Sequence, residues 1–124
     1  MKKKIIATQA PAATGPFSHA IATNNLVFTS GQIYLTPQGK LLDGTTEELV
    51  HQIMHNLLSI LQSAGVSFAN VVKTTIYVTD MGIYGKVNEV YGSYMCEPFP
   101  AREVVCVKEL PLGAKIEISM VAEK

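Results

Sequence analysis

The sequence has no tryptophan, only 7% aromatic residues and no net charge at neutral pH. Ten basic residues balance ten acidic ones, so no overall positive charge would attract nucleic acid or an anionic membrane. Aromatic side chains on which RNA bases could stack are also few. The composition therefore argues against nucleic acid or a membrane as a partner, and against ribonuclease activity. The single basic run, Lys2–Lys4, is expected to lie in a mobile chain end.

Cysteines and long hydrophobic runs are also scarce. Cys96 and Cys106 are the only cysteines, and 48% hydrophobic residues can build a core without a disulfide, so we expect two reduced thiols. The apolar stretch at residues 5–7 is too short for a signal peptide, and no stretch approaches the length of a membrane span. We therefore predict a cytoplasmic protein. Its length of 124 residues predicts a single domain, residues 1–124.

The first half of the chain predicts a hairpin, a turn and a helix. Residues 18–30 read as a β-hairpin, in which Asn24-Asn25 would adopt the positive φ of a tight turn, and Thr36–Gly39 reads as a second turn. A helix is predicted from Thr45, which forms a capping box with Glu48, to a C-cap at Gly65. Apolar residues at helical spacing mark its buried face: Leu49, Ile53, Leu57, Ile60 and Ala64.

The second half predicts one more helix between strands. Residues 71–78 are rich in strand formers, residues 80–94 predict a helix, and two strand-like runs, 103–107 and 116–121, follow. This order predicts an α+β fold in which two helices pack on one face of a mixed β-sheet. Because the other face of a single sheet would stay exposed, we expect copies of the chain to assemble.

Few residues suggest metal or nucleophile chemistry. His51 and His55 stand four residues apart, a spacing that can bind zinc. Both lie off the apolar face of the predicted helix, and no third ligand is near in sequence, so we expect a solvated pair and no metal site. Ser30-Gly31 ends a strand at a glycine, which indicates either a β-bulge or a close approach of the backbone to a ligand.

Arg102 and Glu117 are the charged residues best suited to catalysis, although most such residues are solvated surface groups. Arginine can hold a carboxylate with two parallel hydrogen bonds, and a half-buried glutamate can deprotonate water. If the last two strands form a hairpin, Arg102 lies nearly opposite Val121 and roughly 13 Å from Glu117. That gap would fit a small ligand, or a site completed by a neighbouring subunit.

Six blocks in order, spread over essentially the whole chain, resemble the Rid (YjgF) family. They are Ala10–Ser18, Thr29–Ile33, Val72–Met81, Val87–Tyr91, Pro100–Arg102 and Ile116–Ile118. The resemblance implies a chorismate-mutase-like fold, a homotrimer with sites between subunits, and no cofactor. It further implies an imine deaminase, a hydrolase acting on carbon–nitrogen bonds. Such an enzyme converts 2-aminoacrylate-type imines, including 2-iminopropanoate and 2-iminobutanoate, to 2-keto acids and ammonia.

The resemblance also assigns roles to residues of this sequence. Arg102 would hold the substrate carboxylate and Glu117 would activate water, as the two catalytic residues. Substrate-binding positions would be Phe17, Ser30, Gly31, Asn88 and Val104.

The sequence departs from the family pattern at three positions in or beside this set. Phe17 replaces the usual tyrosine, so its ring can pack but cannot donate a hydrogen bond. Glu103 replaces a small or apolar residue, and Val104 replaces a common cysteine. The missing phenol keeps a second hypothesis open, namely a weakly catalytic trimer that binds 2-keto acids or has a regulatory role.

Overall fold

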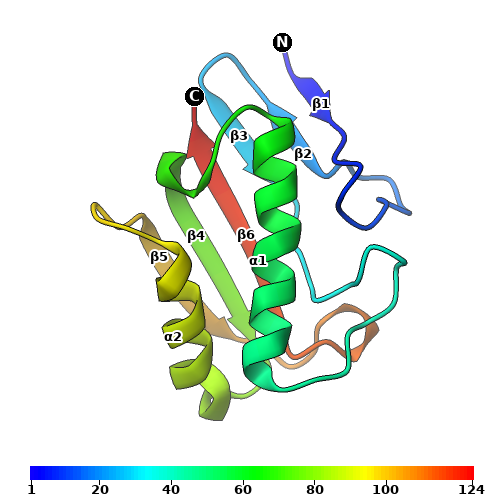
Figure 1. Ribbon diagram of the computed structural model, residues 1–124, viewed down its shortest axis with the longest axis vertical. Helices are drawn as coiled ribbons and strands as arrows, with labels where there is room; N and C mark the ends of the chain where they lie inside the picture. The colour runs from blue at the N-terminus through cyan, green and yellow to red at the C-terminus, as the bar shows by residue number, and fades with distance from the viewer.

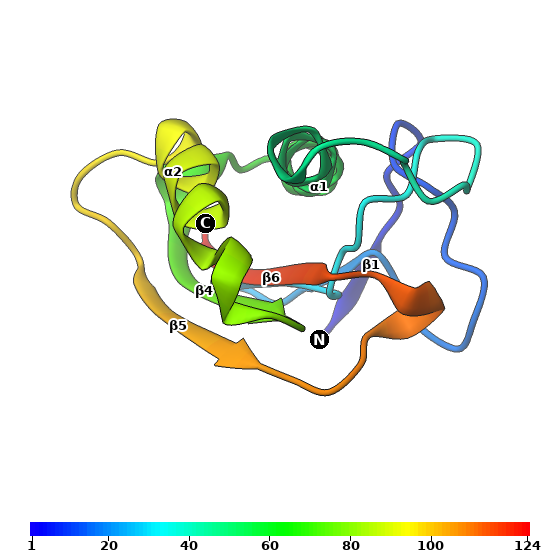
Figure 2. The ribbon, with the colours of Figure 1, turned by 90° about the horizontal axis from the view of Figure 1, so that it is seen from below.

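Six strands form one mixed sheet, and both α-helices pack on the same face of it, in a computed structural model that describes residues 1–124 (Figures 1 and 2). The helices are α1 (Thr46–Ser63) and α2 (Tyr84–Tyr94). The strands are β1 (Lys3–Ile5), β2 (Ala20–Ala22), β3 (Leu26–Thr29), β4 (Val71–Val78), β5 (Ala101–Cys106) and β6 (Ile116–Glu123). Their order across the sheet is β1-β2-β3-β6-β4-β5, and this arrangement confirms the predicted α+β class.

Helix α1 covers the centre of the sheet and supplies much of the core. Its capping box is present: the Glu48 amide donates to the Thr45 hydroxyl, and the Glu48 carboxylate accepts from the Thr45 amide. Such a cap contributes about 1 kcal/mol to helix stability. Gly65, just beyond the helix, has the positive φ expected of a C-terminal glycine. The predicted stripe is buried except at Ala64, which is half-buried.

The N-terminal hairpin forms as predicted, but its turn does not. β2 and β3 pair antiparallel, and neither asparagine between them has a positive φ. The turn is closed instead by Thr23, whose hydroxyl accepts from the Leu26 amide and whose amide donates to the Leu26 carbonyl. The expected mobile N-terminus is also wrong in part, because Lys3 and Lys4 belong to β1, which pairs with β2.

The last two strands do not form a hairpin, which corrects the predicted pairing. β4 lies between them, parallel to β5 and antiparallel to β6. Helix α2 makes the crossover between β4 and β5. It begins at Tyr84, later than predicted, because Asp80 caps a separate 3₁₀ turn, Met81–Ile83, by accepting from the Gly82 amide. β5 is therefore an edge strand beside α2 (Figure 2).

The two faces of the sheet differ in what covers them. Along β6, Ile116, Ile118, Met120 and Ala122 are buried under the helices, and the alternate residues point to the other face. No helix lies on that face (Figure 2), and Phe28 on it is 43% exposed. None of the helices is both long enough and apolar enough to cross a membrane.

Candidate active site

A cavity of about 320 Å³ is lined in part by Glu117, whose side chain projects from the helix-free face of the sheet. Glu117 projects from the middle of β6, opposite Tyr77 of β4. The segment after β3 runs beside β6, where Gln32 pairs with Ile118. This segment, the loop before β2 and the turn before β6 form the other walls of the cavity. The residues that line the cavity include Pro11, Ala12, Ala13, Thr14, Phe17, Gly31, Pro111 and Leu112.

Gly31 allows the Glu117 side chain to lie directly against the backbone. A β-carbon at position 31 would lie 2.7 Å from Cδ of Glu117, closer than normal packing permits, and 3.1 Å from its Cγ, which is a tight contact. This close approach gives a physical reason for the glycine, which from the sequence alone was compatible with either a bulge or a ligand contact. Burial raises the pKa of the Glu117 carboxyl, as is typical of carboxylates that exchange protons during catalysis.

Arg102 lies on the opposite, helix-covered face, at the edge strand β5. Its Nη2 donates to the hydroxyl of Tyr84 at 2.8 Å, and its Nη1 donates to Oδ1 of Asn88. Its Cζ lies 5.7 Å from the ring centroid of Tyr84 and 5.6 Å from that of Tyr91, within cation–π range. Helix α2 thus orients the guanidinium while leaving the side chain exposed to a ligand.

Arg102 and Glu117 cannot meet around one small ligand within a single chain. Arg102 is level with Thr74 of β4 and Glu117 with Tyr77, so they lie two strands across and three residues along, roughly 14 Å apart. In addition, their side chains leave opposite faces of the sheet. The hairpin geometry expected from the sequence is therefore wrong, although the expected separation is similar.

The remaining predicted positions divide between the two faces. Phe17, which is 52% exposed, and Gly31 line the Glu117 cavity. Asn88 contacts Arg102, and half-buried Val104 follows Arg102 on the same face of β5. The hydroxyl of Ser30 donates to the Ser18 carbonyl at 2.5 Å, so it ties two segments together beside Gly31.

Two tyrosines beside Arg102 were not among the predicted positions. Tyr84, Asn88 and Tyr91 are spaced i, i+4 and i+7 on α2, and this spacing is the signal that could have identified them as one face. Tyr91 also donates from its hydroxyl to Oγ1 of Thr74 at 3.0 Å. Burial raises the pKa of Tyr91, partly offset by that hydrogen bond and by the positive charge of Arg102.

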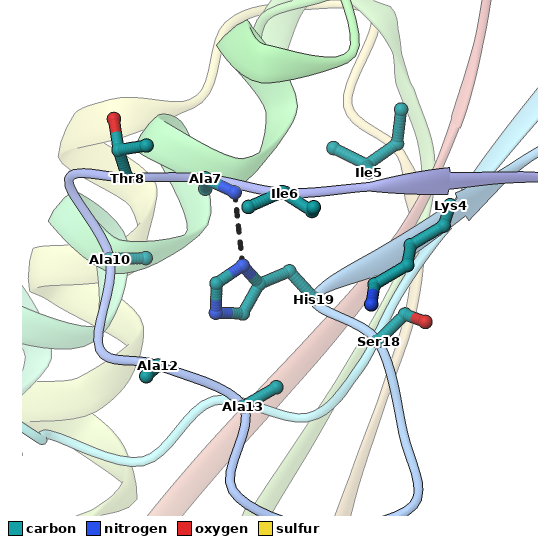
Figure 3. A pocket seen from close by; sticks show the side chains of 10 residues that line it. All are labelled: Lys4, Ile5, Ile6, Ala7, Thr8, Ala10, Ala12, Ala13, Ser18 and His19. Atoms are coloured by element: carbon teal, nitrogen blue, oxygen red, sulfur yellow. Dashed lines mark hydrogen bonds between the residues drawn. The ribbon is translucent and has the colours of Figure 1, made fainter.

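A second cavity, of about 400 Å³, lies beside the first and is lined in part by His19 (Figure 3). The ring is buried between β1 and the loop that follows it. Its Nδ1 accepts from the Ala7 amide at 3.0 Å, so Nε2 carries the proton and donates to the Pro11 carbonyl at 2.6 Å. His19 therefore fixes the loop that lines the Glu117 cavity.

Comparison with known proteins agrees with this architecture. The sequence profile of the family described as Endoribonuclease L-PSP matches residues 7–124. Reactive Intermediate Deaminase A, chloroplastic, from Arabidopsis thaliana is 44% identical, over 98% of this chain and 66% of its own length. The 2-iminobutanoate/2-iminopropanoate deaminase of Mus musculus is 42% identical, over 98% of this chain and 91% of its own.

Solved structures show the same fold. The crystal structure of yeast YEO7 superposes with a TM-score of 0.97 at 36% identity, covering 100% of this chain and 99% of the other. That of E. coli TdcF with bound serine has a TM-score of 0.92 at 30% identity, covering 98% of each chain. The chain is an α+β protein that belongs to the Rid (YjgF) family. Both of these curated relatives carry deaminase names.

Proposed function

We propose that this chain is an enamine/imine deaminase that hydrolyses 2-aminoacrylate-type imines to 2-keto acids and ammonia, as a homotrimer. The observation that carries the proposal is that Arg102 and Glu117 lie on opposite faces of the sheet. Arg102 is held ready for a carboxylate on one face of the sheet, and Glu117 has a half-buried carboxyl on the other. A complete site then requires Arg102 of one protomer to meet Glu117 of its neighbour, which gives the assembly a chemical reason.

The reaction needs only positioning and proton transfer. Arg102 binds the carboxylate of 2-iminopropanoate or 2-iminobutanoate, and so fixes the imine carbon next to it. Glu117 takes a proton from water as the water oxygen bonds to that carbon, and passes the proton to the imine nitrogen. In the resulting carbinolamine Glu117 takes the hydroxyl proton and returns it to the amino group, so that the C–N bond breaks, the C=O bond forms and ammonia leaves. No cofactor takes part in this sequence of steps.

The test couples the purified protein to a serine or threonine dehydratase, which generates the imine, and follows the release of keto acid. We expect the wild-type protein to accelerate release above the spontaneous rate. Arg102→Ala should remove that acceleration, and Arg102→Lys should restore little of it, because an ammonium lacks the planar fork. An Arg102→Ala variant that matches the wild type would contradict the mechanism.

The second candidate, a weakly catalytic 2-keto-acid-binding or regulatory trimer, rests on Phe17. Its ring lines the Glu117 cavity without a hydroxyl to contact the imine. Titration with 2-oxobutanoate separates the two hypotheses. Tight binding without acceleration of keto-acid release would favour the binding protein over the enzyme.

A further inference from the structure

One face of helix α2 surrounds the guanidinium of Arg102. Tyr84 and Tyr91 place their rings against it, and Asn88 accepts a hydrogen bond from it. A guanidinium has five N–H donors, and contacts with Asn88 and Tyr84 occupy two of them. Three donors therefore remain for an incoming ligand.

The hydroxyls of the two tyrosines are used differently. The Tyr91 hydroxyl donates its proton to Oγ1 of Thr74, and that buried contact fixes its direction. The Tyr84 hydroxyl accepts from Nη2 of Arg102, and no group in the chain accepts the Tyr84 proton. Tyr84 thus presents an uncommitted donor within hydrogen-bond distance of the cation that would hold a carboxylate.

We propose that Tyr84 is a ligand-binding residue whose hydroxyl donates a hydrogen bond to a carboxylate oxygen held by Arg102. This inference rests on the proposed function, because it assumes that Arg102 binds the carboxylate of the substrate. An anion bound by Arg102 would orient the free Tyr84 proton towards itself, since a charged acceptor is the strongest one available there. Phe17 has no hydroxyl to offer in the Glu117 cavity, whereas Tyr84 places a phenol hydroxyl beside Arg102.

The test uses Tyr84→Phe, which keeps the ring against Arg102 and removes only the hydroxyl. Tyr94→Phe is the matched control, because Tyr94 ends the same helix and its hydroxyl contacts His51 instead. Calorimetric titrations compare 2-oxobutanoate with its neutral analogue 2-oxobutanamide. We expect Tyr84→Phe to bind 2-oxobutanoate roughly tenfold more weakly, with little change for the amide. In the coupled assay, KM should rise by a similar factor while kcat changes little.

Three results would overturn the proposal. The first is a Tyr84→Phe variant that binds 2-oxobutanoate as tightly as the wild type and Tyr94→Phe do. The second is an equal loss for the acid and the amide, which would mean that Tyr84 only shapes the helix. The third is a wild-type protein that neither binds keto acids nor hydrolyses imines. This third result overturns the proposed function too, whereas the first two leave it intact.

Discussion

The carboxyl group of Glu117 lies half-buried in its cavity, and burial raises its pKa above the usual range. If Glu117 is the general base, activity should rise as this carboxyl ionises, at a pH above that of an ordinary glutamate. Glu117→Gln should lower kcat by about 10²–10⁴-fold, the contribution of a positioned general base. The pH–rate profile of the coupled assay, measured with the dehydratase in excess, tests both expectations.

The pH dependence of stability gives an independent test of the raised pKa of Glu117. Because the folded-state pKa is raised, the folded protein holds more protons than the unfolded chain between the two pKa values. The free energy of unfolding therefore falls as pH rises through that window. Glu117→Gln should remove this fall and melt at a higher temperature than the wild type at neutral pH. Glu123→Gln, at the exposed end of the same strand, is the control. Identical pH dependence of Tm in all three proteins would contradict the raised pKa.

We expect position 31 to require a glycine because the Glu117 side chain lies directly against its backbone. The φ of Gly31 is not in the left-handed region, so backbone conformation is not the reason. Gly31→Ala places a methyl group against Glu117, and we expect it to cost about 1–3 kcal/mol of stability and to lower activity. Gly92→Ala in α2 meets nothing within 4 Å and should stabilise by about 0.5–1 kcal/mol. If the clash is the cause, combining Gly31→Ala with Glu117→Ala should cost less than the sum of the single changes. Additive losses of stability in thermal unfolding would exclude a clash with the Glu117 side chain as the cause.

At the scale of elements, the sequence locates the strands and helices better than it pairs them. Alternation along residues 116–121 identifies the buried face of β6 correctly, because burial acts on each strand separately. It does not reveal which strand lies alongside, so a hairpin between β5 and β6 was a reasonable but wrong expectation. The strand–helix–strand order of β4, α2 and β5 was the better guide, because parallel strands need such a crossover.

The faces occupied by Arg102 and Glu117 depend on that pairing and so could not be obtained from motifs alone. The motifs identify both residues by type and spacing, and Thr45 with Glu48 identifies the start of α1. However, Arg102 faces the helices only because β5 joins β4 in parallel, with Arg102 beside Thr74. The contact with Tyr84 follows from the same register.

His19 connects two elements, because it binds both the end of β1 and the following loop (Figure 3). His19→Ala would leave the Ala7 amide and the Pro11 carbonyl without partners, at a cost of about 1–3 kcal/mol. We also expect faster proteolysis within residues 7–14 and weaker binding of 2-oxobutanoate, because this loop lines the Glu117 cavity. His55→Ala, on the exposed side of α1, should change stability by less than about 0.5 kcal/mol. Equal unfolding free energies for the two variants would show that the His19 hydrogen bonds to Ala7 and Pro11 contribute nothing to stability.

At the scale of the whole molecule, the helix-free face of the sheet and the separation of Arg102 from Glu117 both point to the same partner, a second copy of this chain. The face carries exposed Phe28, and the Glu117 side chain, which lines the cavity, projects from this side of the sheet. Arg102 stands on the edge strand, and its guanidinium lies on the opposite, helix-covered face. A second copy that brings its own Arg102 to this cavity would cover apolar surface and complete the site at once.

Mixing two inactive variants tests this arrangement directly. Arg102→Ala and Glu117→Gln each disable every site of a homotrimer, but a mixed trimer contains clefts that join an intact Arg102 to an intact Glu117 from the next protomer. Trimers that contain both variants should show about a third of wild-type activity, because only one of their three clefts joins the required ordered pair of neighbours. The measurement is keto-acid release by co-expressed chains, purified through different tags on the two variants. Light scattering should give three times the chain mass of 13.4 kDa. Trimers that contain both variants and stay inactive would mean that Arg102 and Glu117 do not act together across a subunit boundary.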